Sequence, residues 1–287
     1  MREDGLFKYP STPHLEGSRL QKGDDESSRL VLANMVGQHA VLEEKMDGAN
    51  CGISFSSTAQ LQLQSRGHFL TGGASERQFN LLKPWAACHE EALFDVLEDR
   101  YVMFGEWMFA KHSMFYDALP HFFLEFDVYD KQQKIFLSTP RRQALLASAP
   151  VVSVPVLHAG PLPHALDRWV GPSVGRGSDW QESLREEAEH RRLDVERVVS
   201  QTDGDGRSEG LYLKFEDSDC VLARAKFVRS SFTQTILDGD GHWNRRPTIA
   251  NRLRSGVDIF SPEVDNRWPP FETAVSPSAR PLRGRNR

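Results

Sequence analysis

The sequence is short of cysteine and of long apolar segments. Its three cysteines, Cys51, Cys88 and Cys220, are odd in number and widely spaced, so neither a disulfide framework nor a cysteine-based zinc site is expected. Free thiols are typical of a reducing compartment, which predicts a cytoplasmic protein. No run of 18 apolar residues occurs, and residues 1–16 contain no apolar stretch after their charges, so neither a membrane span nor a secretory signal is predicted.

The chain also lacks an overall positive charge. Its formal net charge is −5, which argues mildly against nucleic-acid binding, because proteins that bind nucleic acids usually carry a basic surface. The basic residues are unevenly spread, however. Seven lysines and arginines lie between residues 224 and 254, and four arginines lie in the last eight residues. This local excess is compatible with a phosphate-binding face and equally with an ordinary solvated surface.

Several familiar nucleotide-binding and metal-binding motifs are absent. No glycine-rich loop is followed by the Lys and Ser or Thr of a Walker motif, and His89-Glu90-Glu91 lacks the second histidine of a zinc-protease helix. The segment Asp203–Gly206 begins like a calcium loop but has no glutamate at the twelfth position. The ten histidines show no metal-ligand spacing, so any chemistry must come from another arrangement of residues.

Apolar periodicity predicts an α+β chain whose strands are antiparallel. Strands are expected at 39–44, 51–55, 61–64, 101–109, 121–129, 211–215 and 220–224. The 121–129 strand has phenylalanines on both of its faces, so it should be buried on both. A helical stretch is expected at 76–97, and 139–200 should be mostly helical, with a strand near Val154 and a polar helix at 178–191.

Four parts are predicted along the chain from these patterns. Residues 1–38 form a polar N-terminal extension that packs on the core, and 39–229 form the main α+β domain. Residues 230–275 form a small helical or irregular appendage. The segment 276–287 is rich in Pro, Arg and Ser and should be a disordered basic tail.

Charged residues stand at the edges of the apolar runs, where strands can direct them into one cleft. The first group is Lys45-Met46-Asp47-Gly48, in which a glycine permits close approach to a ligand and a lysine with a lowered pKa can act as a nucleophile. Taken alone, this group is better explained as an ordinary hairpin turn. Five more groups follow it in order: Ser65-Arg66-Gly67, Phe104-Gly105-Glu106, Phe126-Asp127, Glu209 to Lys214, and Arg224-Ala225-Lys226. Six such groups in one order are hard to attribute to chance.

The ordered set resembles motifs I, Ia, III, IIIa, IV and V of the covalent nucleotidyltransferase superfamily, which contains polynucleotide ligases and mRNA-capping enzymes. Residues Glu44 to Asn50 are most similar to the RNA ligases, which carry an asparagine three residues after the motif I aspartate. The segment Thr12 to Leu20 resembles the start of a group of bacterial stand-alone RNA ligases and is expected to cover the nucleotide. The resemblance implies a ligase-type nucleotidyltransferase domain of antiparallel sheets flanked by helices over residues 39–229.

The resemblance also implies a chemical role for each matching residue. Lys45 would attack the α-phosphate of ATP to form lysyl-AMP and release pyrophosphate, and Asn50 would contact the 5′-phosphate of the polynucleotide. The expected catalytic residues are Lys45, Asp47, Glu209 and Lys226. The expected ATP and AMP contacts are Glu44, Arg66, Glu106, Phe126, Lys214, Arg224 and Lys226. Asp47, Glu106 and Glu209 would hold Mg²⁺ or Mn²⁺ mostly through water, as Mg²⁺ prefers.

The substrate expected from the resemblance is RNA with a 5′-phosphate and a 3′-hydroxyl, either single-stranded, nicked or hybridised to DNA. Sixty-one residues follow Lys226, too few for the OB-fold of capping enzymes and typical DNA ligases. A minimal DNA ligase that seals nicks remains an alternative, and so does a non-catalytic module that binds nucleic-acid ends. The presence of Lys45, Glu106, Glu209 and Lys226 argues against the module. A monomer is expected, with a separate kinase or phosphatase as a partner that prepares the ends.

Overall fold

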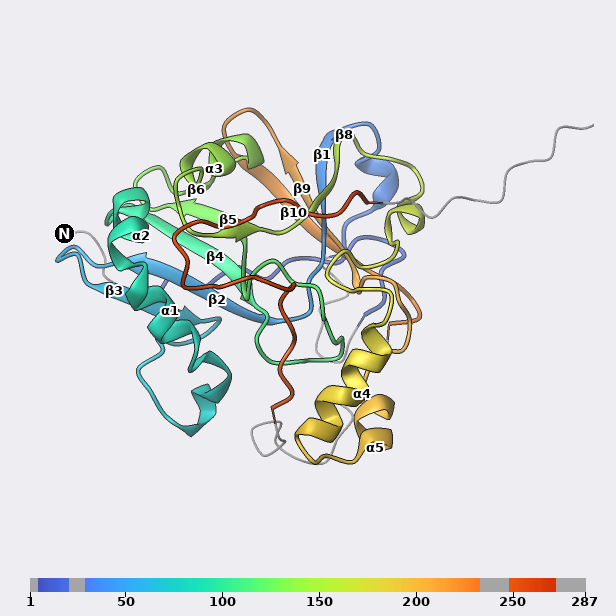
Figure 1. Ribbon diagram of the computed structural model, residues 1–287. Helices are drawn as coiled ribbons and strands as arrows, with labels where there is room; N and C mark the ends of the chain where they lie inside the picture. Colours follow the sequence, from blue (N-terminus) through green and yellow to red (C-terminus); the bar gives the residue numbers. More distant parts are fainter. Residues whose placement is uncertain (1–4, 21–28, 233–247, 272–287) are drawn as a thin grey trace, which may run out of the picture.

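The computed structural model describes residues 5–20, 29–232 and 248–271, and two antiparallel sheets dominate it (Figure 1). The first sheet has the strand order β10 (Val221–Val228), β9 (Gly210–Glu216), β1 (His39–Glu44) and β8 (Val156–Pro161). The second has the order β3 (Leu61–Ser65), β2 (Ala49–Phe55), β4 (Tyr101–Trp107), β5 (Phe123–Asp130) and β6 (Ile135–Phe136), with β7 (Val152–Ser153) parallel to β5. The predicted α+β class with antiparallel strands is confirmed.

The chain passes from the first sheet to the second within four residues, Lys45 to Gly48, between β1 and β2. This link can be tight because a Cβ on Gly48 would lie 2.6 Å from Met108 Sδ and 3.0 Å from the Trp107 carbonyl oxygen. Any larger residue would therefore displace β4. The first charged group of the sequence is thus fixed at the junction of the two sheets.

The largest hydrophobic core lies on the second sheet and is rich in aromatic side chains. Strand β5 is buried over Phe123 to Val128, as its phenylalanines on both faces predict. Trp85 of helix α1 (Leu82–Cys88) stacks on Phe123 at a ring-centroid distance of 5.3 Å, and Leu93 and Leu97 of helix α2 (Glu90–Leu97) are fully buried. These two helices therefore cover the second sheet (Figure 1).

The helical regions are more broken than the sequence predicts. The expected stretch 76–97 consists of a 3₁₀ turn (Ala74–Phe79), α1 and α2, and the α1–α2 break falls at His89. At this break, the Nε2 atom of His89 lies 3.1 Å from the Ile259 carbonyl oxygen. Region 139–200 contains helices α3 (Thr139–Leu145), α4 (Trp180–His190) and α5 (Val195–Ser200) and a 3₁₀ turn (Leu166–Trp169). A further short 3₁₀ turn spans Leu32–Asn34.

The strand expected near Val154 is present as two short strands, β7 and β8, on either side of that residue. The full extent of β8 carries little signal in the sequence. It is an edge strand with exposed and half-buried residues, and it ends in Gly160-Pro161, so neither an apolar run nor a clean alternation marks it. Strand β8 is held by its antiparallel pairing with β1, which lies far away in the sequence. Such a tertiary contact leaves no local signal.

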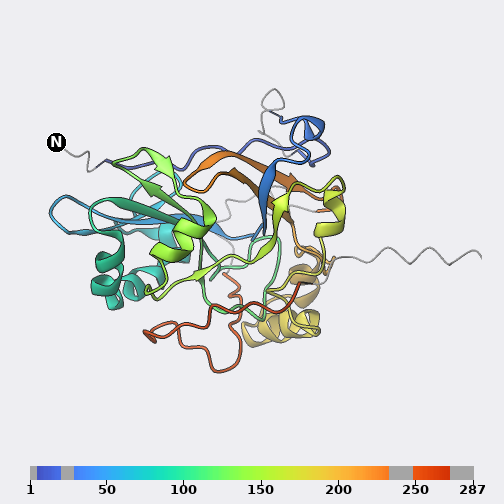
Figure 2. The same ribbon diagram turned by 90° about the horizontal axis from the view of Figure 1, so that it is seen from above.

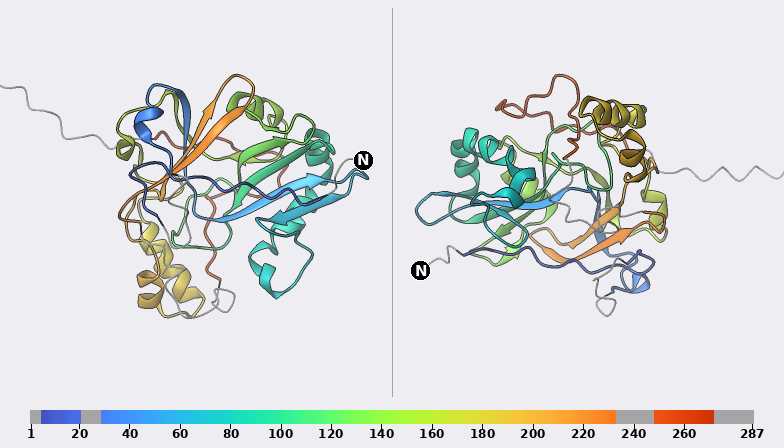
Figure 3. Two further views of the ribbon diagram at one scale, coloured as in Figure 1. Left: turned by 180° about the vertical axis from the view of Figure 1, so that it is seen from behind. Right: turned by 90° about the horizontal axis from the view of Figure 1, so that it is seen from below.

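Two terminal segments lie on opposite faces of the domain (Figures 2 and 3). Residues 9–20 run beside the outer edge of β10, where Leu15 is fully buried. Residues 248–271 contain no helix. They form an irregular strap. Its Ala250 makes an isolated β-bridge to Ala110 of the domain, and its Ile259 is buried. The helical form of the appendage expected at 230–275 is thus not seen in the described part 248–271, and residues 233–247 and the expected tail 276–287 lie outside the described residues. None of the described helices is long and apolar enough to cross a membrane.

Candidate active site

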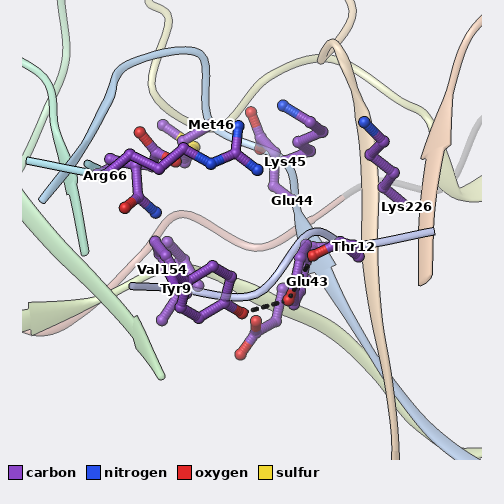
Figure 4. A pocket seen from close by; sticks show the side chains of 13 residues that line it. Tyr9, Thr12, Glu43, Glu44, Lys45, Met46, Arg66, Val154 and Lys226 are labelled. Atoms are coloured by element: carbon purple, nitrogen blue, oxygen red, sulfur yellow. Dashed lines mark hydrogen bonds between the residues drawn. The ribbon is translucent and has the colours of Figure 1, made fainter. Parts of the chain in front are cut away.

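A cavity of about 150 Å³ lies where the two sheets and the N-terminal segment meet (Figure 4). Its wall residues come from β1, β2, β4, β5, β9, β10 and the segments beside them. They are Tyr9, Thr12, Glu43, Glu44, Lys45, Met46, Asn50, Arg66, Glu106, Phe126, Val154, Tyr212 and Lys226. Seven of the eleven predicted site residues are therefore gathered around one cavity, although they span residues 44 to 226.

Lys45 stands at the centre of this arrangement. Its amide donates to the Gly210 carbonyl oxygen at 3.0 Å, so the β1–β9 pairing continues into the lysine. Its Nζ donates to Glu209 Oε2 at 2.8 Å. Gly210 makes this approach possible, since a Cβ there would lie 1.9 Å from the Phe227 carbonyl oxygen. The close β9–β10 contact thus places Glu209 against Lys45.

The electrostatics of this group are dominated by carboxyls. Burial lowers the pKa of Lys45, but the adjacent Glu209 carboxylate, with Glu106 and Asp47, outweighs burial and raises the pKa above its ordinary value. Burial raises the pKa of Glu209 to about 7 and that of Glu106 to about 8, although Lys45 counteracts both shifts. The expectation that Lys45 has a lowered pKa is therefore not met by the chain alone. A proton must leave Lys45 before it can attack.

Two predicted residues hold the backbone around Lys45. The buried Glu44 carboxylate accepts hydrogen bonds from the Ser173 hydroxyl and, at 3.1 Å, from the Val174 amide, and burial raises its pKa to about 7. Asp47 Oδ2 accepts from the Met114 amide at 2.7 Å. Asp47 does not line the cavity, but it fixes the far side of the turn that presents Lys45.

Two unsatisfied oxygen atoms belong to paired residues of β2 and β4. Asn50 and Glu106 are cross-strand partners, and Asn50 Oδ1 and Glu106 Oε2 are buried without a hydrogen-bond partner. Arg66 follows β3 and is exposed at the same wall, opposite Lys226 (Figure 4). Unsatisfied carboxylate and amide oxygens are the atoms that a hard cation or a donor group of a ligand would satisfy.

The cavity does not offer a direct metal cage. Among the residues that the structure describes, no three His, Cys, Asp or Glu side chains converge closely enough to hold a metal ion. Asp47 and Glu209 direct oxygens at Met114 and Lys45 instead. Asp47, Glu106 and Glu209 therefore fit a hydrated cation that they would contact through water, in the way the sequence predicts. The unpaired Glu106 Oε2 is the oxygen best placed to act as a ligand.

The other end of the cavity is aromatic. The predicted base-stacking residue Phe126 is buried in its wall, with Tyr212 at a ring-centroid distance of 6.0 Å and Tyr9 at 5.3 Å. Tyr212 lies inside a motif that the sequence singles out, where its alternation with Leu211 and Leu213 could have marked it. Thr12 opens the segment Thr12 to Leu20, which is expected to cover the nucleotide, whereas Tyr9 lies outside every predicted motif and carries no such signal.

Lys214 and Arg224, two of the residues predicted to contact the nucleotide, do not line the cavity. The wholly buried Lys214 Nζ lies 3.0 Å from Glu43 and 3.1 Å from Asp127. The Arg224 guanidinium lies 3.3 Å from Asp127 and packs 3.8 Å from the Phe136 ring centroid. Carboxylates already neutralise both cations, so these residues support the wall from behind.

Comparison with known proteins gives one family. The model of the RNA ligase family matches residues 38–228. Solved structures with a similar chain include a mutant RNA ligase of Naegleria gruberi with ATP and Mn, at 17% identity over 69% of this chain and 51% of that one, with a TM-score of 0.46. Another mutant of that ligase, with AMP and Mn, matches at 17% identity, 69% and 52% coverage and a TM-score of 0.45. The chain thus spans about half the length of these structures, and no curated protein sequence matches it.

Proposed function

Because the chain belongs to the RNA ligase family, we propose that it is an ATP-dependent RNA ligase that joins 5′-phosphate and 3′-hydroxyl ends. The observation that carries the proposal is the placing of the Lys45 amine. It lies 2.8 Å from Glu209, in a cavity that also contains Lys226 and Arg66 as cations and Phe126 as an aromatic wall. A nucleophile, phosphate-binding charge and a base-stacking surface are the parts that nucleotidyl transfer needs.

In the first step, Lys45 loses its proton and its amine attacks the α-phosphate of ATP. A nitrogen–phosphorus bond forms and the bond to pyrophosphate breaks, which leaves AMP on Lys45. Lys226 and Arg66 neutralise phosphate charge, and Phe126 with Tyr212 holds the adenine. Glu209, the hydrogen-bond partner of Lys45, is the nearest group that can accept its proton.

In the later steps, a 5′-phosphate oxygen of the RNA takes AMP from Lys45, and a 3′-hydroxyl then displaces AMP to form the phosphodiester. Asn50, which lies in the cavity wall, donates from its side-chain NH2 group to the 5′-phosphate end. Asp47, Glu106 and Glu209 would hold Mg²⁺ or Mn²⁺ through water. When bound, the cation would neutralise charge on the phosphates.

The RNA ligase family match supports RNA rather than DNA as the joined strand. The form of the RNA, a monomeric state, a cytoplasmic location and a separate end-preparing kinase or phosphatase belong to the same proposal. The three free cysteines are in keeping with a reducing compartment.

Intact-mass measurement tests the first step. Freshly prepared protein from which bound AMP has been removed should gain one AMP when it is incubated with ATP and Mg²⁺, and Lys45→Ala should gain none. An unchanged mass for the wild type would contradict the proposal that the protein is a ligase. A ligation panel then tests the substrate: 5′-phosphorylated single-stranded RNA, nicked duplex RNA, RNA splinted on DNA, and nicked DNA. Sealing of nicked DNA alone would overturn the assignment to RNA.

A further inference from the structure

Part of the cavity wall lies outside the segment that matches the RNA ligase family. The match begins at residue 38, yet Tyr9 and Thr12 line the cavity. In Figure 4, Tyr9 lies across the cavity from Lys45 and Lys226. The N-terminal segment therefore completes a site whose other members come from the nucleotidyltransferase domain.

This segment is joined to the domain at a strand that contributes to the site. The Lys226 amide donates to the Pro13 carbonyl oxygen, and the Leu15 amide donates to the Lys226 carbonyl oxygen, both at 2.9 Å. Leu15 is fully buried in the core of the first sheet. The Val228 amide donates to Ser18 Oγ at 2.9 Å. Residues 13–18 thus extend the sheet beyond β10 and hold Tyr9 in place.

Tyr9 is fixed at both its hydroxyl and its ring. The hydroxyl donates to Asp127 Oδ2, contacts the Tyr212 hydroxyl and accepts from Arg224 at 3.1 Å. The ring is 4% exposed and stands edge-on to Phe126 at an interplanar angle of 84°. Its orientation is therefore set by the protein before any ligand is bound, which reduces the entropy lost on binding.

We propose that Tyr9 is a positioning residue for the purine base of the nucleotide, forming the end wall of a base pocket whose side walls are Phe126 and Tyr212. The inference rests on the proposed function, because it assigns the aromatic end of that cavity to the base. A flat ring held perpendicular to Phe126 limits how far a stacked base can slide along it. Tyr9 thus fixes the distance between the base and the α-phosphate that faces Lys45.

The segment supplies its own control. Phe7, two residues before Tyr9, stacks on Tyr129 at a ring-centroid distance of 3.8 Å and does not line the cavity. Phe7→Ala therefore removes an aromatic anchor of the same segment without changing the cavity wall. Tyr9→Phe keeps the end wall and removes the hydroxyl, and Tyr9→Leu keeps apolar bulk without a flat ring.

Two measurements test the role of Tyr9. The first is the affinity of ATP with Mg²⁺ by calorimetry, and the second is the rate of lysyl-AMP formation as a function of ATP concentration. Tyr9→Ala and Tyr9→Leu should weaken ATP binding and raise KM about tenfold, as expected for the loss of an aromatic contact with a base, with kcat within about twofold. Phe7→Ala should stay within about threefold of the wild type in KM, and Tyr9→Phe, which keeps the ring but loses the hydroxyl contacts, should lie between the wild type and Tyr9→Leu. If Tyr9→Ala does not fold, Tyr9→Leu carries the test.

The outcomes separate this inference from the proposed function. If the wild type forms lysyl-AMP but Tyr9→Leu has an unchanged KM, or if Phe7→Ala raises KM equally, the end-wall role is overturned and the ligase proposal stands. A wild type that binds ATP without forming lysyl-AMP contradicts the ligase proposal, and the binding data still decide the role of Tyr9. A wild type that does not bind ATP overturns both.

Discussion

Two groups of charged residues lie beside each other in this domain and differ in how completely their charges are matched. The reactive cluster comprises Lys45, Asp47, Glu106 and Glu209. The buried ion network, behind Phe126, has three carboxylates and three cations: Glu43, Glu125, Asp127, Arg142, Lys214 and Arg224, the last of which pairs with Asp127 at 3.3 Å. In the network, Arg142 pairs with Glu43 at 2.7 Å and with Glu125 at 3.2 Å, and Lys214 pairs with Glu43 and Asp127. In the reactive cluster, three carboxyls surround Lys45, and two of them have strongly raised pKa values.

The difference shows which group is complete without a ligand. Arg142 and Lys214 both donate to the Phe126 carbonyl oxygen, so the buried network uses its matched charges to fix a cavity wall. The reactive cluster has three carboxyls around one lysine, which is more negative charge than Lys45 can balance. It is therefore suited to receive a cation and the phosphates that accompany it, at a cost in stability.

Lys45→Arg should have the largest effect on activity and almost none on folding. Arginine keeps the positive charge beside Glu209 but cannot lose its proton to become a nucleophile. Lysyl-AMP formation should fall by at least about 10³-fold, to below detection by intact mass, while the unfolding temperature stays close to that of the wild type. Lys134→Arg, at an exposed turn, is the matched control. Measurable adduct on Lys45→Arg would show that another residue accepts AMP.

Lys214→Met should show the opposite pattern. Removing Lys214 breaks two buried ion pairs and leaves Glu43 with Arg142 alone and Asp127 with Arg224 alone. Breaking a buried ion pair costs about 3–5 kcal/mol. Chemical denaturation should report that loss relative to Lys134→Met, whose exposed site predicts a change within about 0.5 kcal/mol. Equal stabilities for the two variants would mean that the network does not hold the two sheets together.

Glu209→Ala should fold normally and seal poorly. The change removes the hydrogen-bond partner of Lys45 and one proposed contact to a hydrated cation. Sealing should fall by about 10-fold to 100-fold, as when an outer contact to a metal is lost. The control is Glu196→Ala, which removes a carboxylate with 81% of its side chain exposed. Sealing at the wild-type rate would contradict the proposed role of Glu209.

Much of the fold and most of the site could be predicted from the sequence, because the motif residues stand at the ends of apolar runs. The strands that carry Lys45, Glu106 and Lys226 have clear apolar patterns, so the sequence predicts both where these residues lie and which chemistry they can perform. Lys214 shows where such reading fails. It ends a matching motif and shares a face of β9 with the cavity-lining Tyr212, yet its amine is paired with Glu43 and Asp127. The sequence of β9 alone does not reveal these partners.

Other features of the molecule depend on contacts between distant segments. The edge strand β8 pairs with β1, and the strap at 248–271 packs irregularly on the domain. Tyr9 reaches the cavity through a sheet extension that has no strand-like pattern of its own. None of these contacts is encoded in periodicity or in spacing.

Glu106→Gln should have the smallest effect, a gain in stability that depends on pH. The folded pKa of Glu106, about 8, lies above its ordinary value because burial disfavours the carboxylate. As pH rises between these two pKa values, the unfolded chain has lost the proton that the native state retains, so the free energy of unfolding falls with rising pH. Glutamine removes this fall. In EDTA, the variant should match the wild type near pH 4.5 and exceed it by about 1 kcal/mol at pH 8, since solvent reaches the half-buried carboxyl and reduces the cost. The exposed-site variant Glu196→Gln should show no such trend. If the difference in the free energy of unfolding between Glu106→Gln and the wild type stays constant from pH 4.5 to 8, the reactive cluster accommodates its ionised carboxylates without a cation. The contrast between the reactive cluster and the buried ion network would then disappear.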